Sequence, residues 1–499
     1  MESIKAFKAR LQEVHNLDGA MSLLGWDQQV KMPVGGASHR AAQMGTLSKI
    51  RHEMFTAEET GRLLEDAETE GTGLDYDADD AALLRVVRHD YDLATKVPTA
   101  LVEERTRVRM LAQGAWVKAR PENDYESFKP WIKQMFDLTV QMAEHLGYED
   151  CIYDALLDQY EPGMKTAQVA GLFEELKEAQ IPMIRALADQ KGHSNDLLKL
   201  DYAEGAQETF GIEVAKAIGY DFGRGRLDVS PHPFTSNYGR DDVRITTRYR
   251  KNWLPSAMFG TMHECGHGMY EQGSADSLAG TYLEGGTSLG LHESQSRLWE
   301  NLVGRSKNFW RHYFPRVQEL FPAALGDVDM ETFYQAINHV EPSLIRVEAD
   351  EVTYNMHIII RFELENELVE GTLSVDDAPD AWNAKYEEYL GITPPNHTDG
   401  ILQDIHWSMG LVGYFATYSL GNLLSVPLYN KALEAHPEIP AEVAQGEFGT
   451  LYRWLQANVY APGRKYTPTE LFQRVTGETI SAQPYLAYLR EKYGELYDL

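Results

Sequence analysis

The sequence predicts a mainly α-helical protein with one small β-sheet. Through most of the 499 residues, apolar side chains recur at spacings of three and four, as in helices that bury one face. The segment 223–250, "GRGRLDVSPHPFTSNYGRDDVRITTRYR", departs from this pattern. Gly, Pro and Asn cluster in it, and the run from Val243 to Tyr249 alternates apolar or β-branched residues with polar ones, which is typical of strands.

Three regions follow in order. Residues 1–220 are expected to form successive amphipathic helices, such as 4–26 and 79–97, and residues 223–250 a small sheet or hairpin. From 251 to 499 the helical pattern resumes, with one helix expected from Pro255 to Gly273 and a long one from Pro342 to a stop near Gly371. Because neither a linker nor an internal repeat is visible, we expect a single catalytic domain over 1–499.

The composition excludes several classes of partner. With 46 Lys and Arg against 76 Asp and Glu, the formal charge is -30, so the average surface repels nucleic acid and anionic lipid. The N-terminal segment lacks the apolar block of a signal peptide, and no stretch approaches the roughly 18 apolar residues of a membrane span. Cys151 and Cys265 are the only cysteines, which fits a reducing compartment. We therefore expect a soluble, cytoplasmic protein.

The segment "FGTMHECGHGMYEQG" (259–273) carries the first chemical signal. On a helix, His263 and His267 lie one turn apart on one face, where two imidazoles can share a tetrahedral zinc ion. Glu264 can then serve as general base toward a water molecule that the metal activates. Cys265 belongs to an apolar stripe on the opposite side with Met258, Met262 and Met269, so we interpret it as a packing residue.

A catalytic zinc ion needs a third protein ligand and an open fourth position. The metzincin pattern is excluded, because it requires His where this chain has Gly273. Glu284 lies in "LEGGTS", which looks mobile, whereas Glu293 lies in "SLGLHESQSRLWENLVG" opposite a leucine stripe that can hold it in place. Glu293 is therefore the preferred ligand; the alternative is that it only pairs with Arg297 one turn along.

A polar stripe suggests how a substrate is held. In the helix expected from Pro342, Arg346, Asp350, Thr353 and His357 fall on one line through an otherwise apolar element. A fixed cation on such a line can bind a carboxylate group of a substrate, and Arg346 would suit. The alternative is a solvated Arg346/Asp350 pair on a helix face.

Further candidates lie in "QDIHWSMGLVGYFATYSLGN" (403–422). An imidazole and a phenol can both donate hydrogen bonds to the oxyanion of a tetrahedral intermediate. The segment contains His406, Tyr414 and Tyr418, and either tyrosine could instead be ordinary aromatic packing.

Several motifs together give a resemblance to a known family. "HPF" (232–234), "DVRIT" (242–246), "HECGH" (263–267), "HESQSR" (292–297), "IRVEAD" (345–350) and "GILQDIHW" (400–407) occur in one order along the chain. In these segments the chain resembles the carboxypeptidase Taq family of zinc metallocarboxypeptidases. The resemblance implies a helical, zincin-like fold with a deep substrate groove, similar to neurolysin and angiotensin-converting enzyme, with the small sheet beside the HEXXH helix.

The same resemblance implies site residues and partners. His263, His267 and Glu293 would hold one zinc ion per chain, which cobalt can replace, and Glu264 would be the base. Arg346, His406, His232 and Arg244 would contact the substrate. By analogy with other zinc peptidases of this fold, Tyr414 or Tyr418 would stabilise the oxyanion, and the sequence does not choose between them. The sequence alone makes His232 and Arg244 turn and edge-strand residues, where an extended peptide could add as a strand. The resemblance also implies a homodimer and peptide substrates with a free C-terminus.

The function expected is release of single C-terminal amino acids by zinc-activated water. An oligoendopeptidase of the same fold is the main alternative. An aminopeptidase is disfavoured because the GxMEN sequence is missing: "GAMS" at 19–22 lacks its Glu. A non-catalytic helical binding protein is a further alternative, but structural zinc sites are usually richer in cysteine than this chain.

Overall fold

The computed structural model describes residues 2–188, 190 and 194–498. They fall into two compact units. Unit 1 comprises Met1–Thr95, Ser194–Ile337 and Ser425–Thr479, and unit 2 comprises Lys96–His193, Asn338–Leu424 and Ile480–Leu499. Helices dominate both units, so the predicted fold class is confirmed. The single catalytic domain expected over 1–499 stays a prediction.

Unit 1 contains the sheet, the N-terminal helices and the helices that follow the sheet. In chain order its elements are α1 (Glu2–Val30), η1 (Val34–Gly36), α2 (Ala37–Phe55), α3 (Glu58–Glu70), α4 (Asp79–Lys96), η2 (Asp196–Lys199), α9 (Glu204–Ile218), β1 (Gly225–Val229), β2 (Thr235–Asn237), β3 (Val243–Thr247), α10 (Pro255–Gln272), η3 (Asp276–Leu278), α11 (Leu289–Arg297), η4 (Leu298–Val303), α12 (Lys307–Leu320), α13 (Pro322–Leu325), α14 (Met330–Ile337), α18 (Ile439–Val443), α19 (Gly449–Leu455), η7 (Gln456–Tyr460) and α20 (Pro468–Thr476).

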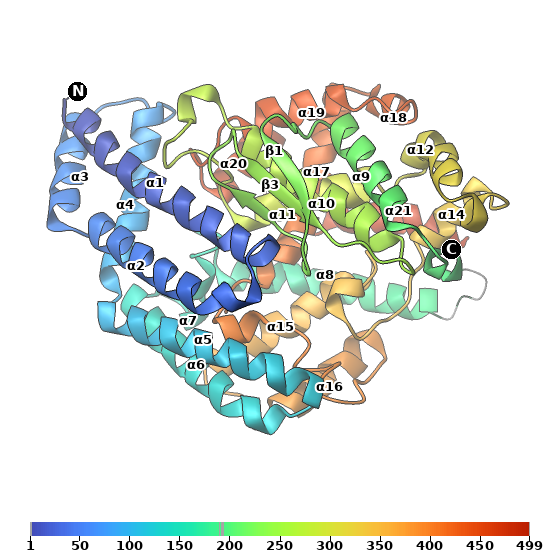
Figure 1. Cartoon of the computed structure of the whole chain (residues 1–499), viewed down its shortest axis with the longest axis horizontal. Coiled ribbons are helices and arrows are strands. Elements are labelled where there is room, and N and C mark those ends of the chain that lie inside the picture. The colour runs from blue at the N-terminus through green and yellow to red at the C-terminus, as the bar shows by residue number, and fades with distance from the viewer. Residues whose placement is uncertain (1, 189, 191–193, 499) are drawn as a thin grey trace. The chain divides into compact units, whose positions relative to one another are not determined.

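The N-terminal helices are held by an apolar cluster. The buried face of α1 carries apolar residues at spacings of three and four, and α1 packs against α2 and α3 (Figure 1). Its side chains join a buried cluster that includes Leu64 of α3, Val87 of α4 and Leu283 from the segment before α11. This cluster therefore ties the first helices to the part of unit 1 that leads into α11.

The predicted small sheet is confirmed, with strand order β1-β3-β2. β1 runs parallel to β3, and β2 runs antiparallel to it. The sheet packs against α10 (Figure 1), where Thr261 donates a hydrogen bond to Thr247 at 3.0 Å between their hydroxyl oxygens. The sheet thereby supports the helix that carries the two histidines.

The expectation that Arg244 lies on an edge strand is wrong. Arg244 lies on β3, the central strand, paired with Arg226 of β1 on one side and Ser236 of β2 on the other. Because both edges of β3 are already hydrogen-bonded, a peptide cannot add as a strand there. The Arg244 guanidinium instead pairs with Asp242 at 2.8 Å and stacks over Trp26 at 4.7 Å.

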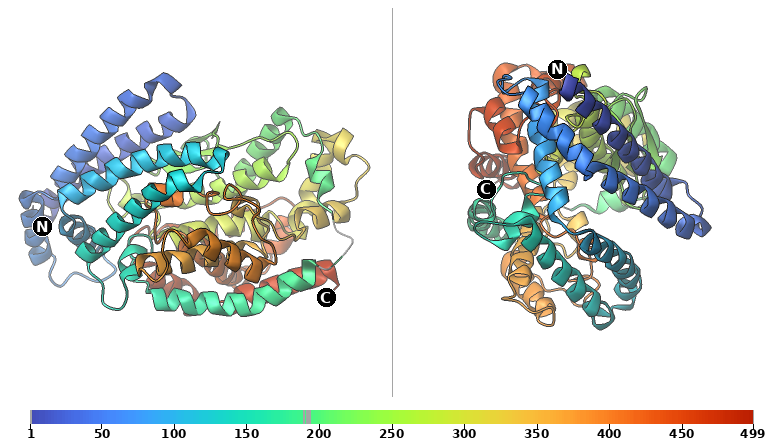
Figure 2. Two further views of the ribbon diagram at one scale, coloured as in Figure 1. Left: turned by 90° about the horizontal axis from the view of Figure 1, so that it is seen from below. Right: turned by 90° about the vertical axis from the view of Figure 1, so that its left-hand side faces the viewer.

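Unit 2 is helical in the part that the structure describes. Its elements are α5 (Thr99–Glu122), α6 (Tyr125–Leu146), α7 (Ile152–Leu157), α8 (Thr166–Ala188), η5 (Arg346–Glu348), α15 (Tyr354–Val369), α16 (Ala378–Leu390), η6 (His406–Met409) and α21 (Gln483–Tyr497), and α17 (Ala416–Ala435) continues from it into unit 1. α5 and α6 pack along each other (Figure 2), and α5 also contacts η6. Of the helices in the described ranges, none is apolar over enough residues to cross a bilayer.

The long helix expected from Pro342 is only partly present. α15 begins at Tyr354, and Arg346 lies in the short η5 before it. The Asp350 carboxylate accepts hydrogen bonds from the backbone N–H groups of Val352 and Thr353, at 2.9 and 3.0 Å, and so forms a turn where a helix would have to continue. The polar stripe from Arg346 to His357, and the Arg346/Asp350 pair, are therefore not helical features.

Candidate metal centre and substrate-binding residues

A close approach of two helices positions the centre of unit 1. α10 begins at Pro255 and ends before Gly273, as predicted, and Cys265 in its apolar stripe is fully buried. α11 crosses α10 at Gly266, between the histidines: a Cβ there would lie 2.6 Å from the Gln295 carbonyl oxygen and from the Ser296 Cα. Only glycine lets the two backbones come this close.

This approach brings Glu293 to the two histidines. Glu293 Oε2 lies 3.6 Å from His263 Nε2 and 3.4 Å from His267 Nε2. One ligand atom from each residue falls within 4.8 Å of the other two. Tetrahedral ligands about 2.0–2.1 Å from a zinc ion are about 3.3 Å apart, so these separations fit a shared ion.

The two oxygens of Glu293 have different partners. Arg297 Nε donates to Oε1 at 2.7 Å, while Oε2 faces the histidines. The predicted alternatives, an Arg297 pair and a metal ligand, are thus geometrically compatible. Burial alone would raise the pKa of the Glu293 carboxyl, but Arg297 and the imidazoles outweigh it and hold that pKa well below the usual range.

Hydrogen bonds behind the histidines define their tautomers. His263 Nδ1 lies 2.9 Å from a Glu300 oxygen, which can only accept, so Nδ1 donates and Nε2 keeps its lone pair. His267 Nδ1 lies 2.6 Å from His292 Nδ1, and His292 Nε2 lies 2.5 Å from Glu271 Oε1. Because Nε2 of a neutral His292 donates to Glu271, its Nδ1 accepts from His267. The Nε2 atom of each of the two histidines, His263 and His267, then has a lone pair free for a shared metal ion, as ligation requires.

Glu264 is held beside this centre by the sheet. It is buried, and its Oε2 accepts a hydrogen bond from the Thr235 hydroxyl of β2 at 2.7 Å. Burial raises the pKa of the Glu264 carboxyl above its usual value. A buried carboxylate with one such donor is suited to receive a proton.

The expectation that Glu284 lies in a mobile loop is wrong. Glu284 is buried and accepts hydrogen bonds from the backbone N–H groups of Arg240 and Gly280. Its carboxylate therefore closes two loops of unit 1, and it is absent from the group of potential metal ligands found in the described residues.

The donor set fits a divalent metal. Two imidazole nitrogens and one carboxylate oxygen are the protein ligands of a known class of catalytic zinc site. Each donor is oriented by a second group: Glu300 behind His263, His292 behind His267, and Arg297 behind Glu293.

In unit 2, the half-buried Asp404 brings together two arginines. Arg346 donates to Asp404 from Nη2 at 2.9 Å, and Arg361 donates to the same carboxylate from Nε at 2.7 Å. Arg346 also donates to the Tyr354 hydroxyl at 3.2 Å. The two guanidinium groups hold the pKa of the Asp404 carboxyl well below its usual range, although burial opposes them. Arg346 is thus already paired within the protein.

The candidate His406 lies beside both candidate tyrosines. His406 Nε2 is 3.2 Å from the Tyr418 hydroxyl, and the His406 and Tyr414 rings are 5.5 Å apart. Glu365, fully buried on α15, holds the loop that carries His406 and Tyr414: it accepts from Trp407 Nε1 at 2.9 Å and from the Gly413 N–H at 3.0 Å.

The remaining candidate, His232, lies in the turn between β1 and β2 and is exposed. The Ser230 hydroxyl donates to the His232 carbonyl oxygen at 2.7 Å, which shapes that turn. His232 and Arg244 are thus on the sheet of unit 1, whereas Arg346 and His406 belong to unit 2.

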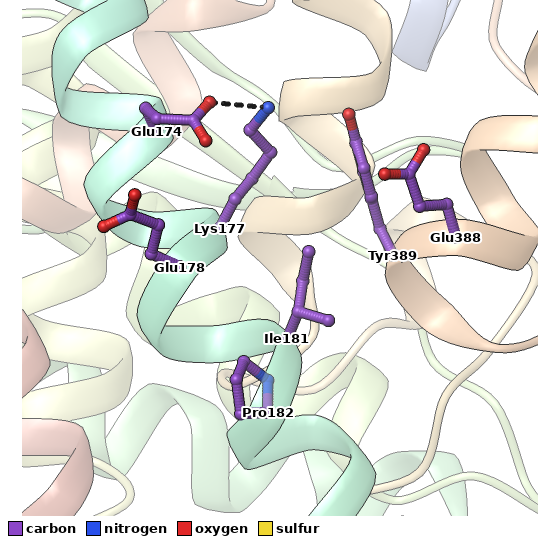
Figure 3. A pocket seen from close by; sticks show the side chains of 7 residues that line it. All are labelled: Glu174, Lys177, Glu178, Ile181, Pro182, Glu388 and Tyr389. Carbon is purple, nitrogen blue, oxygen red and sulfur yellow. Dashed lines mark ion pairs between the residues drawn. The ribbon is translucent and has the colours of Figure 1, made fainter.

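A surface groove of unit 2 contains none of these candidates. It lies between α8 and α16, has a volume of about 270 Å³, and is open to solvent (Figure 3). Its lining includes Glu174, Glu178 and Glu388, with Lys177 paired to Glu174 at 2.8 Å. It brings together carboxylates but no nucleophile or imidazole, so the chemistry is expected elsewhere.

Several residues behind the candidates were not predicted from the sequence. Glu271 lies four residues after His267 and Glu300 seven after Glu293, so helical spacing could have pointed to both. His292, Thr235, Arg361 and Glu365 give no such signal, because their partners lie on other segments of the chain.

Comparison with known proteins gives matches over nearly the whole chain. The family model described as Carboxypeptidase Taq (M32) metallopeptidase matches residues 6–493. Thermostable carboxypeptidase 1 of Thermus thermophilus is 44% identical over 487 residues, which are 95% of each chain. Carboxypeptidase 1 of Bacillus subtilis is 37% identical over 494 residues, covering 99% of this chain and 98% of the relative.

Solved structures agree with these matches. The M32 carboxypeptidase from Deinococcus radiodurans superposes with a TM-score of 0.97 at 42% identity, covering 100% of both chains. A carboxypeptidase structure from Pyrococcus furiosus gives a TM-score of 0.96 at 37% identity and 99% coverage of both.

Gly266→Ala tests the helix approach. The added methyl group would collide with the backbone of α11, so we expect a loss of about 1–3 kcal/mol in unfolding free energy and at least tenfold weaker binding of a divalent metal, because Glu293 moves away from the histidines. Thermal unfolding and chelator competition measure the two effects. Gly260→Ala, on the same helix, is the control, because no neighbouring atom of the described residues lies within 4 Å of a Cβ at that position. Unchanged metal affinity in Gly266→Ala would contradict this account.

Glu365→Gln tests the buried carboxylate of unit 2. Burial raises the pKa of Glu365 to about 7. Between its ordinary pKa and about 7, Glu365 therefore keeps a proton in the folded state that it releases in the unfolded state. The stability that this carboxyl contributes is fully present below its ordinary pKa and is lost as pH rises through about 7. A shift of this size is worth at most about 3 kcal/mol. We expect the stability of the wild type to fall between pH 5 and 8 more than that of the variant.

The control for this experiment is Glu363→Gln on the same helix. Burial opposes the shift, but Lys385 and Lys177 lower the pKa of Glu363. The stability that Glu363 contributes is therefore present above its ordinary pKa and lost only as pH falls below it. Glu363→Gln should leave the slope between pH 5 and 8 unchanged, and an equal slope for all three proteins would refute the role of Glu365.

Proposed function

Because this chain belongs to the M32 family of carboxypeptidase Taq metallopeptidases, it is a metal-dependent carboxypeptidase, and we propose that it uses zinc to release single C-terminal amino acids from peptides. The named relatives are carboxypeptidases, which disfavours the oligoendopeptidase alternative. The observation that carries the proposal is the convergence of Glu293 Oε2 on Nε2 of both histidines, at 3.4 and 3.6 Å.

In this proposal His263, His267 and Glu293 hold one zinc ion per chain. These three residues would hold the ion, and the chemistry it would supply there is activation of water and polarisation of the scissile carbonyl group. Cobalt is expected to substitute, because an imidazole and carboxylate set accepts several first-row metals.

Glu264 is the proposed general base. Its buried carboxylate accepts a proton from the attacking water and later passes it to the leaving amine. The Thr235 hydroxyl donates a hydrogen bond to Glu264 Oε2, and Oε1 is proposed to exchange the proton.

Residues of unit 2 are proposed to bind the substrate. Of the two candidate tyrosines, Tyr418 is favoured as the partner of His406 in stabilising the oxyanion, because its hydroxyl already contacts the imidazole at 3.2 Å. Arg346, although paired with Asp404, is proposed to lie in the substrate-binding region and to support binding of the terminal carboxylate. His232 and Arg244 are proposed to contact the peptide chain from the sheet.

Two further expectations belong to the same proposal. The chain is expected to act in the cytoplasm on peptides with a free C-terminus, and to form a homodimer. Size-exclusion chromatography with light scattering measures the oligomeric state directly.

Glu264→Gln is expected to retain the metal and to lose at least about 10²-fold in kcat, because the amide cannot take up the proton. Metal content and steady-state kinetics check this on the same sample. Glu208→Gln, on the exposed face of α9, is the control and should match the wild type. Near-normal turnover by a metal-loaded Glu264→Gln protein would remove Glu264 from the role of base.

A peptide offered as free acid and as C-terminal amide tests the exopeptidase activity. We expect stepwise release of single residues from the free acid, and at least about tenfold slower cleavage of the amide, since an ion pair with the carboxylate is lost. Mass spectrometry of the products distinguishes terminal from internal cleavage. A chelated sample is the control and should be inactive until zinc or cobalt is added. Equal cleavage of both peptides at internal bonds would favour an endopeptidase.

A further inference from the structure

Arg105 on α5 is a half-buried arginine whose charge is not balanced by an acidic group among the residues that the structure describes. Within the part of the chain that the structure describes, its hydrogen bond is to a neutral acceptor: Nη2 donates to the Gly410 carbonyl oxygen at 2.6 Å. Its Nε is buried, and no acceptor in the described ranges reaches it. Burying an unpaired charge costs free energy. The chain contains 76 acidic residues, so the missing partner of Arg105 calls for an explanation.

The other buried arginines of unit 2 differ from Arg105. Arg346 and Arg361 share Asp404, and Glu365 lies near enough to Arg361 for the two charges to interact. Two guanidinium groups are thus accompanied by two carboxyl groups. The charge of Arg346 is largely compensated by Asp404, whereas that of Arg105 has no such compensation among the described residues.

The surroundings of Arg105 favour an anion. Burial and the charge of Arg109, one helical turn along, both lower the pKa of the Arg105 guanidinium, yet such a group stays protonated in proteins. The phenol of Tyr160 lies close enough to interact with it, and burial raises the pKa of Tyr160 to about 12, which keeps the hydroxyl a neutral donor. A cation and a phenol donor together match a carboxylate.

Arg105 lies at the loop that carries the candidate catalytic residues. Gly410, which accepts its hydrogen bond, follows η6 with its His406. Gly410 has a left-handed φ of 68°, and a Cβ there would come within 3.2 Å of Arg105 Nη2, so glycine leaves room for the guanidinium. The Tyr160 ring packs edge-on against Tyr414 at 5.3 Å.

These side chains are also accessible. Arg105, Tyr160, Tyr414 and Tyr418 are each partly exposed, whereas the residues of the loop between them are largely buried. Each of these four side chains therefore keeps some contact with solvent.

We propose that Arg105, with the Tyr160 hydroxyl as a second donor, binds the free terminal carboxylate of the peptide substrate. This inference rests on the proposed carboxypeptidase function and names the residue that recognises the substrate end. Binding of the carboxylate supplies the counter-charge that Arg105 lacks, and so places the C-terminal residue beside His406 and Tyr414.

The test uses the metal-loaded, full-length protein and Arg105→Gln. With N-acetyl dipeptides as free acids we expect KM to rise about 10- to 100-fold, as for loss of a charged hydrogen bond, with a smaller change in kcat. The corresponding amides should be cleaved as slowly as by the wild type, so the preference for free acids collapses. Arg107→Gln is the matched control, since it removes the same charge from the same helix at an exposed position.

Isothermal calorimetry with N-acetylphenylalanine and with its amide measures the affinity of the subsite without turnover. The wild type should prefer the carboxylate, Arg105→Gln should lose this preference, and Arg105→Lys should keep part of it. A preference that survives in Arg105→Gln, or that is absent from the wild type, overturns the inference. If binding depends on Arg105 but free acids and amides are hydrolysed equally, the subsite stands and the carboxypeptidase function fails.

Tyr160→Phe keeps the test decisive if Arg105→Gln does not fold, as judged by thermal unfolding and metal content. Removing one neutral donor is expected to raise KM for free acids about three- to tenfold and to leave the amides unaffected. An equal change for both substrates would mean that Tyr160 only packs the loop, and would count against the subsite.

Discussion

The centre of unit 1 depends on the contact of α11 with α10 at Gly266. A side chain at this position would lie against the α11 backbone, so the absence of one lets Glu293 reach the turn that carries His263 and His267. The other hydrogen bonds of the centre depend on this short distance between the two helix backbones. Arg297 can hold one oxygen of Glu293 while the other faces the imidazoles, and Glu300 can reach His263 from η4, a π-helical turn of a kind often found at functional sites.

Around this contact, hydrogen bonds from neighbouring polar groups fix the orientation of the two histidine rings. The chain Glu271–His292–His267 and the pair Glu300–His263 direct both Nε2 lone pairs to one point. The same logic recurs in unit 2, where Glu365 bonds to Trp407 and Gly413 on either side of the loop that carries His406. In both units, buried carboxylates are satisfied by donors from other segments, which favours one arrangement over alternatives.

The distribution of positive charge in unit 2 bears on substrate recognition. Arg346 was singled out by its motif, but its guanidinium lies against Asp404, which Arg361 also contacts. Arg105 belongs to none of the motifs and lacks an acidic partner in the described part of the chain. Membership of the M32 family explains the shared motifs, whereas the balance of charges is a property that emerges only when separate segments pack together.

The sequence by itself determined the features that depend on neighbours along the chain. The span of α10, the pairing of His263 with His267 on one face, the buried position of Cys265 and the sheet near 223–250 all follow from helical or strand periodicity. The tertiary structure alone decided that Arg244 is central in the sheet, that Asp350 ends the helix expected from Pro342, and that Glu284 is buried. Periodicity identifies which face of an element is buried, but the partner that it meets comes from a distant segment, and no local pattern encodes that contact.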